Sequence, residues 1–81
     1  MTLYEYNALD ELEQANAVTD YGVFIAQLVN KDYKLLLYQI EAFYVEVWYE
    51  YKANKITKYR SFSSTEQLKP YLNQINLQGL E

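Results

Sequence analysis

Among the side chains of this sequence, the carboxylates are the best candidates for a catalytic pair. The chain has 11 Asp and Glu residues but no His and no Cys, so it lacks the commonest general base, a thiolate nucleophile and thiolate zinc ligands. Glu46 and Glu50 fall on one face of a predicted strand, but four residues of strand separate them by about 13 Å. The paired carboxylates of glycosidases lie roughly 5–9.5 Å apart. We therefore expect no catalytic carboxylate pair.

The other polar groups are explained by secondary structure. Asp10 and Glu13 lie one helical turn apart and could hold a hard cation weakly, but a solvated helix face accounts for both. The hydroxyls of residues 61–65 have no His and no identified buried Lys to activate them, and they suit turn and capping positions. Two glycines in the whole chain leave no glycine-rich phosphate loop. The sequence therefore predicts a protein that is not an enzyme and that carries no cofactor and no metal.

Two segments show helical periodicity. Residues 4–19 are predicted to form an N-terminal helix, with acidic residues in the first turns that suit the helix dipole. Its apolar stripe is predicted to consist of Ala8, Leu9, Leu12, Ala15 and Val18 or Thr19. Residues 64–75 are predicted to form a second helix. Ser64 and Gln67 would make a capping box at its start, and Pro70 is expected to kink it. Its stripe is predicted to consist of Leu68, Tyr71, Leu72 and Ile75.

The segments between these helices are predicted to be strands. They are rich in β-branched and aromatic residues, and they cover residues 22–29, 33–40, 43–52 and 56–62. Their short connections favour antiparallel pairing of consecutive strands. The fold class is therefore predicted to be α+β, a single domain over residues 1–81. In it, a four-stranded antiparallel meander sheet is flanked by an N-terminal and a C-terminal helix.

The predicted turn at Glu41-Ala42 determines which residues share a sheet face. It puts Ile40 opposite Phe43 on one face of the sheet, which we name face A. Both helices are expected to cover face A. This face is expected to hold Phe24, Ala26, Leu28, Leu36, Tyr38, Ile40, Phe43, Val45, Val47, Tyr49, Tyr51 and Tyr59.

The loop between the third and fourth strands is predicted at residues 53–55. Cross-strand pairs would then join Glu50 to Lys58 as an ion pair and Trp48 to Arg60 as a cation–π pair. These four side chains lie on the opposite face of the sheet, face B. A register shifted by one residue would place two cations on face A, where burial without partners is costly.

Face B is too apolar near the first two strands to be left in water. Either the helices divide between the two faces, or face B is a surface for association. The predicted association surface consists of Val23, Ile25, Leu35, Leu37, Tyr44 and Trp48. The first strand is also an edge without charge from residue 21 to 29, whereas Lys55, Lys58 and Arg60 protect the last strand against edge pairing. We therefore expect a partner strand, a helix or a neighbouring subunit to cover the first strand.

Composition restricts the class of partner. The chain has ten Tyr and one Trp, and aromatic residues near Lys52 and Lys55 could stack on single-stranded nucleic acid. The net charge of −4 argues against nucleic acid, because phosphate neutralisation supplies most of such affinity. No apolar run approaches the ~18 residues of a membrane span, and the acidic N-terminal segment is unlike a signal peptide. The sequence therefore predicts a cytoplasmic protein without a membrane partner.

The run Leu37-Tyr38-Gln39-Ile40 is followed by Phe43-Tyr44-Val45-Glu46-Val47, then by Ser61-Phe62-Ser63-Ser64-Thr65 and Pro70-Tyr71-Leu72. Through these runs, the C-terminal half of the chain resembles a set of small uncharacterised bacterial proteins with no established activity. The resemblance implies a free-standing small bacterial domain and implies nothing about mechanism.

These observations favour a non-enzymatic protein-association domain that pairs with itself, as a homodimer, or with another protein. The alternative is a small-ligand or carbohydrate-binding module that uses Tyr44 and Trp48 on an aromatic sheet face. A further alternative is a protein that binds or mimics nucleic acid.

Overall fold

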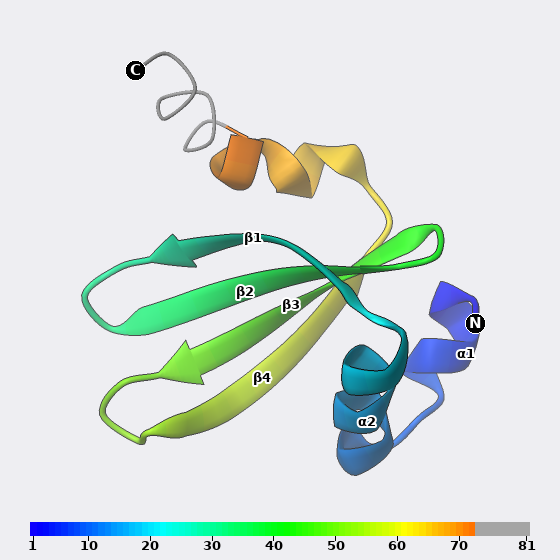
Figure 1. The fold of residues 1–81 in the computed structure, drawn as a ribbon, viewed down its shortest axis with the longest axis horizontal. Helices are drawn as coiled ribbons and strands as arrows, with labels where there is room; N and C mark the ends of the chain where they lie inside the picture. The colour runs from blue at the N-terminus through cyan, green and yellow to red at the C-terminus, as the bar shows by residue number, and fades with distance from the viewer. Residues whose placement is uncertain (73–81) are drawn as a thin grey trace.

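Four antiparallel strands form one sheet in the order β1-β2-β3-β4 in the computed structural model, which describes residues 1–72. The strands are β1 (Val23–Val29), β2 (Tyr33–Ile40), β3 (Phe43–Glu50) and β4 (Lys55–Phe62). Helical segments precede and follow the sheet (Figure 1). The predicted α+β fold with an antiparallel meander is therefore confirmed.

The N-terminal segment forms two helices where the periodicity predicted one. They are α1 (Leu3–Asn7) and α2 (Glu11–Tyr21), and each begins with a capping box. At the start of α2, the side chain of Asp10 accepts a hydrogen bond from the backbone N–H of Glu13 at 2.8 Å, and the Glu13 side chain accepts one from Asp10. These reciprocal bonds satisfy backbone donors that would otherwise lack partners, so a second helix begins here. The two carboxylates considered as cation ligands thus start a helix.

The break between the helices changes which residues face the sheet. Leu12, assigned to the predicted apolar stripe, is 72% exposed, and Ala8 is exposed as well. The buried residues are Tyr6 in α1 and Ala17 and Val18 in α2, and Leu9 packs against their cluster. The predicted stripe is therefore confirmed at Leu9 and Val18 but wrong at Ala8 and Leu12, because it continued a single helical phase through residues 8–10, where the chain leaves the helix.

The C-terminal segment begins with η1 (Thr65–Leu68), a turn of 3₁₀-helix, and continues as helix over 69–72. Ser64 is the N-cap, as predicted, and its side chain accepts a hydrogen bond from the backbone N–H of Glu66 at 3.2 Å. Pro70 lies in the first turn after the 3₁₀ segment. At that position its missing N–H breaks no helical hydrogen bond. The predicted helix start at Ser64 is therefore confirmed, but the predicted capping box is not formed, because the Gln67 side chain accepts a hydrogen bond from Arg60 instead.

Only part of the predicted C-terminal stripe points into the protein. Leu68 packs on buried residues of face B and Tyr71 is 2% exposed, but Leu72 is 49% exposed. The expectation that Leu72 belongs to the core is wrong. Ile75 and the last residues, Leu80-Glu81, lie outside the described residues.

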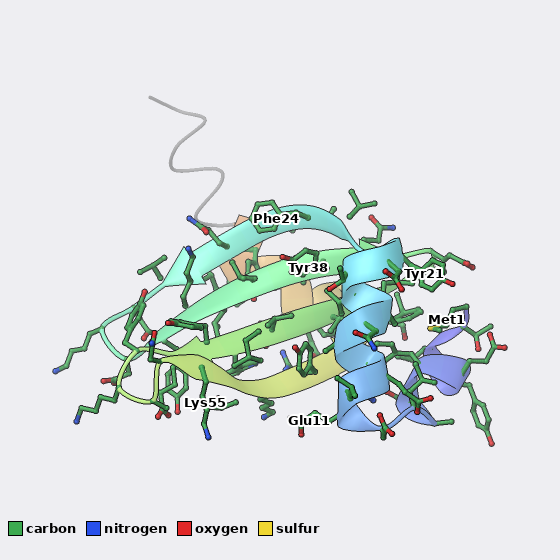
Figure 2. All side chains as sticks on the ribbon, turned by 60° about the horizontal axis from the view of Figure 1, so that its bottom comes forward. Met1, Glu11, Tyr21, Phe24, Tyr38 and Lys55 are labelled. Carbon is green, nitrogen blue, oxygen red and sulfur yellow. The ribbon has the colours of Figure 1, made fainter. Side chains whose placement is uncertain are left out.

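The helices divide between the two faces of the sheet. Figure 2 shows α2 crossing the front of the strands while the C-terminal helix lies behind them. One buried cluster, on face A, consists of Tyr6, Ala17, Val18, Ile40, Phe43, Val45 and Val47. A second, on face B, consists of Ala26, Leu37, Phe62 and Tyr71. The expectation that both helices cover face A is wrong, and the alternative of divided helices is confirmed.

Pairing between β2 and β3 follows the predicted turn. Ile40 lies opposite Phe43, and Glu41 adopts a φ of 52° in the two-residue connection. Pairing between β1 and β2 contains an irregularity between Phe24 and Ala26. Beyond it, Ala26 lies opposite Leu37, on face B. The expectation that Ala26 and Leu28 lie on face A is therefore wrong, because one extra residue reverses the alternation.

Pairing between β3 and β4 differs from the predicted register. Trp48 lies opposite Lys58, and Glu50 lies opposite Lys55. The loop covers residues 51–54, and a further irregularity follows Trp48. The predicted Glu50–Lys58 pair is thus absent from the ladder. At Trp48 the observed register differs from the predicted one by two residues. Because side chains alternate with a period of two, a shift of two residues keeps Lys58 on face B, as predicted.

Candidate functional site

A buried carboxylate lies at the centre of face B. Glu46 is only 4% exposed, although its strand neighbours are apolar. Its Oε1 atom accepts hydrogen bonds from Trp48 Nε1 at 2.9 Å and from Arg60 Nε at 3.0 Å. Its Oε2 atom accepts a hydrogen bond from the hydroxyl of Tyr71. We name Glu46, Trp48, Arg60, Gln67 and Tyr71 the Glu46 cluster.

Three elements bring the Glu46 cluster together. Glu46 and Trp48 are two residues apart on β3, so both point to face B, and Arg60 lies directly opposite Glu46 on β4. Nη1 of Arg60 donates a hydrogen bond to Oε1 of Gln67 in η1. The C-terminal segment is therefore joined to the sheet by Gln67 and by Tyr71, in addition to apolar contact.

The chemistry of the Glu46 cluster is structural. Both carboxylate oxygens accept hydrogen bonds, and the pairing with Arg60 balances the charge within the partly buried site. Burial, the hydrogen bond to Glu46 and the negative charge of Glu46 raise the pKa of Tyr71 far above its ordinary value. A carboxylate held by three donors is poorly placed to act as a general base. We interpret the cluster as the connection that holds residues 65–72 on face B.

Tyr6 contrasts with Tyr71, because its buried hydroxyl has no hydrogen-bond partner among residues 1–72. The Tyr6 ring packs against Phe43 with a centroid separation of 5.5 Å. Burial, and to a smaller extent Tyr59, raises the pKa of Tyr6 to about 12. The ring therefore contributes apolar packing, while the hydroxyl is left without compensation for lost hydration.

Two matched substitutions test these roles. Tyr6→Phe should raise the free energy of unfolding by about 0.5–1 kcal/mol, because an unpaired hydroxyl is removed, whereas Tyr71→Phe should lower it by about 1–3 kcal/mol.

Both phenols have raised folded-state pKa values. Ionisation of these phenols should therefore leave the free energy of unfolding of the wild type unchanged below about pH 10 and lower it as the pH rises above that value. Each Phe variant should lose less stability than the wild type over the same rise in pH. Urea titrations near neutral pH and above about pH 10 measure both effects; equal shifts for the two variants at neutral pH would contradict the assignment.

The structure separates the six residues predicted as an association surface. Val23 is 63% exposed, and Ile25, the additional residue at the irregularity in β1, is 43% exposed. Leu37 is 1% exposed within the face B cluster, and Leu35 and Tyr44 pack against that cluster. The expectation that a partner can reach Leu37 is therefore wrong, because the C-terminal segment covers this side chain.

Trp48, the sixth of these residues, is half-buried and belongs to the Glu46 cluster. Its ring makes an edge contact with Tyr33 at a centroid separation of 5.3 Å, and the Lys58 ammonium lies 5.1 Å from its centroid. Tyr44 stacks on Phe62 with a centroid separation of 5.6 Å. The face B aromatics are thus engaged by side chains of their own sheet.

Exposed apolar side chains gather along β1. We name Tyr21, Val23, Phe24, Ile25 and Val29 the β1 patch; each is exposed, although all five side chains are large. β1 is an edge of the sheet, with β2 on its other side. The sequence prediction included Val23 and Ile25 but omitted the other three. The uncharged run of residues 21–30 was the signal that includes all five.

A shallow groove of about 360 Å³ separates α2 from β4. Its lining includes the exposed Leu12 together with Ala15 and Ile56. Within residues 1–72, no group of three or more acidic side chains is arranged to hold a metal ion. In the same part of the chain, no helix has the length and apolar character needed to cross a membrane.

Neither a protein-family model, nor a curated protein, nor a solved structure matches this chain. The resemblance to small bacterial proteins therefore stays a prediction.

Proposed function

We propose that this chain is a non-enzymatic protein-association domain that forms a homodimer through the β1 patch. The observation that carries the proposal is the exposure of four large apolar side chains on the uncharged edge strand β1, with a fifth, Tyr21, at the end of α2 just before it. Monomeric proteins rarely leave such side chains contiguous and exposed, and contiguous patches commonly mark interaction sites. An unpaired edge strand also presents backbone donors and acceptors to a partner.

The two edges of the sheet support the proposal by their contrast. Lys55, Lys58 and Arg60 lie along β4, where their charges discourage edge pairing. β1 carries no charged residue in its sequence VFIAQLV. A homodimer that covers β1 leaves β4 at the outside of the assembly, where its charges remain hydrated.

The binding of a sugar or small ligand to face B has weaker support. Tyr44 and Trp48 would supply its stacking surface, but Phe62 and Tyr33 already contact them. A stacking ligand would have to displace these contacts. The β1 patch requires no such rearrangement before a partner binds.

Val23→Lys tests the homodimer. Light scattering at about 10 and about 500 μM, a range that brackets micromolar affinity, should give the dimer mass for wild type at the higher concentration. Val23→Lys should remain monomeric there while keeping the wild-type circular dichroism, because Val23 is 63% exposed and a lysine can be hydrated in the monomer.

Leu12→Lys is the matched control, since Leu12 is 72% exposed but lies on α2 beside β4. It should dimerise like the wild type. Monomeric wild type at both concentrations would overturn the proposal, and equal weakening by both lysine variants would show that the interface lies elsewhere.

A further inference from the structure

Acidic and basic residues predominate at opposite ends of the sheet. Every charged residue before Lys31 is an acid, and these acids lie in and around α1 and α2. At the opposite end, the turns and the residues next to them hold Lys31, Lys34, Lys52 and Lys55 against the two acids Asp32 and Glu50, so this end is basic on balance. In Figure 2, Glu11 lies at the helical end and Lys55 lies near the turns at the opposite end.

β1 connects these two ends directly. Asp20 lies in the last turn of α2, immediately before β1, and Lys31 lies in the turn immediately after it. Asn30 accepts hydrogen bonds from the backbone N–H groups of Asp32 and Tyr33, which fixes this turn and leaves Lys31 exposed at its tip.

The C-terminal end of α2 lacks a compensating positive charge of its own. Its last turn contains no basic residue, so the negative end of the helix dipole adds to the charge of Asp20. Lys34 lies opposite Val29 and Tyr49, hence on face A, the face that α2 covers. Among residues 1–72, neither Asp20 nor Lys31 nor Lys34 has an ion-pair partner.

We infer that two copies join their β1 strands antiparallel about a two-fold axis near the middle of β1, which makes one continuous sheet. This arrangement rests on the homodimer proposed above. The end of α2 in each copy then lies beside the partner's Lys31 and the partner's Lys34. Because a two-fold interface repeats every contact, the charge match is made twice.

Parallel pairing of the same strands would be opposed by charge. It would place the acidic end of one copy beside the acidic end of the other, with Asp20 near its own equivalent. Antiparallel pairing instead brings each acidic end to a basic end and keeps face A of both copies on one side. The irregularity at Ile25 does not prevent β1 from pairing with β2 on both sides of it.

Charge reversals of opposite sign test the arrangement. Asp20→Lys alone, and Lys31→Glu combined with Lys34→Glu, should each weaken the homodimer about tenfold at low salt, because attraction becomes repulsion at two sites. An equimolar mixture of the two variants should regain the wild-type affinity, since every contact in the mixed dimer joins opposite charges. Sedimentation equilibrium at low salt and at about 0.5 M salt should show that these differences are screened.

Glu11→Lys provides the control, because it makes the same change in net charge on the same helix but at the β4 side. It should leave the dimer affinity unchanged. A dimeric wild type whose affinity is insensitive to both reversals, or a mixture that stays weak, would overturn the antiparallel arrangement and leave the homodimer standing. A wild type that stays monomeric would overturn both proposals and would mean that the irregularity at Ile25 protects the edge from pairing.

Discussion

Leu37→Lys is expected to unfold the chain, not to release a folded monomer from a dimer. Leu37 is 1% exposed and belongs to the face B cluster with Ala26, Phe62 and Tyr71. An ammonium group there would have no partner in an apolar environment, which costs several kcal/mol. A domain of this length has a stability of roughly 4–12 kcal/mol. Far-UV circular dichroism and urea titration should therefore show a partly or fully unfolded variant.

The control for Leu37→Lys is Val23→Lys, which introduces the same group on the neighbouring strand. Val23 is 63% exposed, so that variant should keep the wild-type urea midpoint when both proteins are measured at a concentration at which the wild type is monomeric. A folded Leu37→Lys protein with an unchanged midpoint would mean that the C-terminal segment does not cover face B.

The strands could be predicted from the sequence more accurately than the helices. β2 has the predicted bounds, Tyr33–Ile40, and the turn at Glu41 fixes its register with β3. Both features depend on local signals, namely alternation and a short connection. The prediction of a single N-terminal helix failed because the periodicity continues through Asp10, whose side chain caps the start of a new helix.

The face assignments depended on register and failed where the strands contain irregularities. One additional residue near Ile25 moves Ala26 to face B. The sequence contains no sign of this change, because β1 is apolar on both faces and either assignment buries similar side chains. In the β3–β4 pairing, a register two residues away from the predicted one, together with the irregularity after Trp48, moves Glu50 from Lys58 to Lys55.

The Glu46 cluster was missed, although its members were visible in the sequence. The sequence pattern presents Glu46 only as one of a carboxylate pair with Glu50, and Tyr71 only as part of an apolar helix stripe. A carboxylate between two valines in the middle of a strand is itself a signal, because a buried charge needs partners. Arg60 on the next strand and Trp48 two residues away are of the right types. The contribution of Tyr71 could not be foreseen, since it requires the position of the C-terminal segment.

Glu46 is expected to contribute strongly to stability, because it is buried and accepts three hydrogen bonds. Glu50, four residues further along β3, supplies a matched comparison. Glu50 lies on the same face but is half-exposed, and its side chain accepts one hydrogen bond, from the hydroxyl of Tyr33. Removing Glu46 would deprive Trp48, Arg60 and Tyr71 of their acceptor and leave a cavity. Removing Glu50 would leave a hydroxyl that water can reach.

Glu46→Ala should therefore lower the free energy of unfolding by about 3–5 kcal/mol, the range for breaking a buried ion pair, while Glu50→Ala should lower it by about 1 kcal/mol or less. Urea titrations of the two variants measure the difference. Combining Glu46→Ala with Tyr71→Phe should cost less than the sum of the two single losses, because Tyr71 has already lost its acceptor. Equal losses for Glu46→Ala and Glu50→Ala, or strict additivity with Tyr71→Phe, would show that the carboxylate does not hold the C-terminal segment on the sheet.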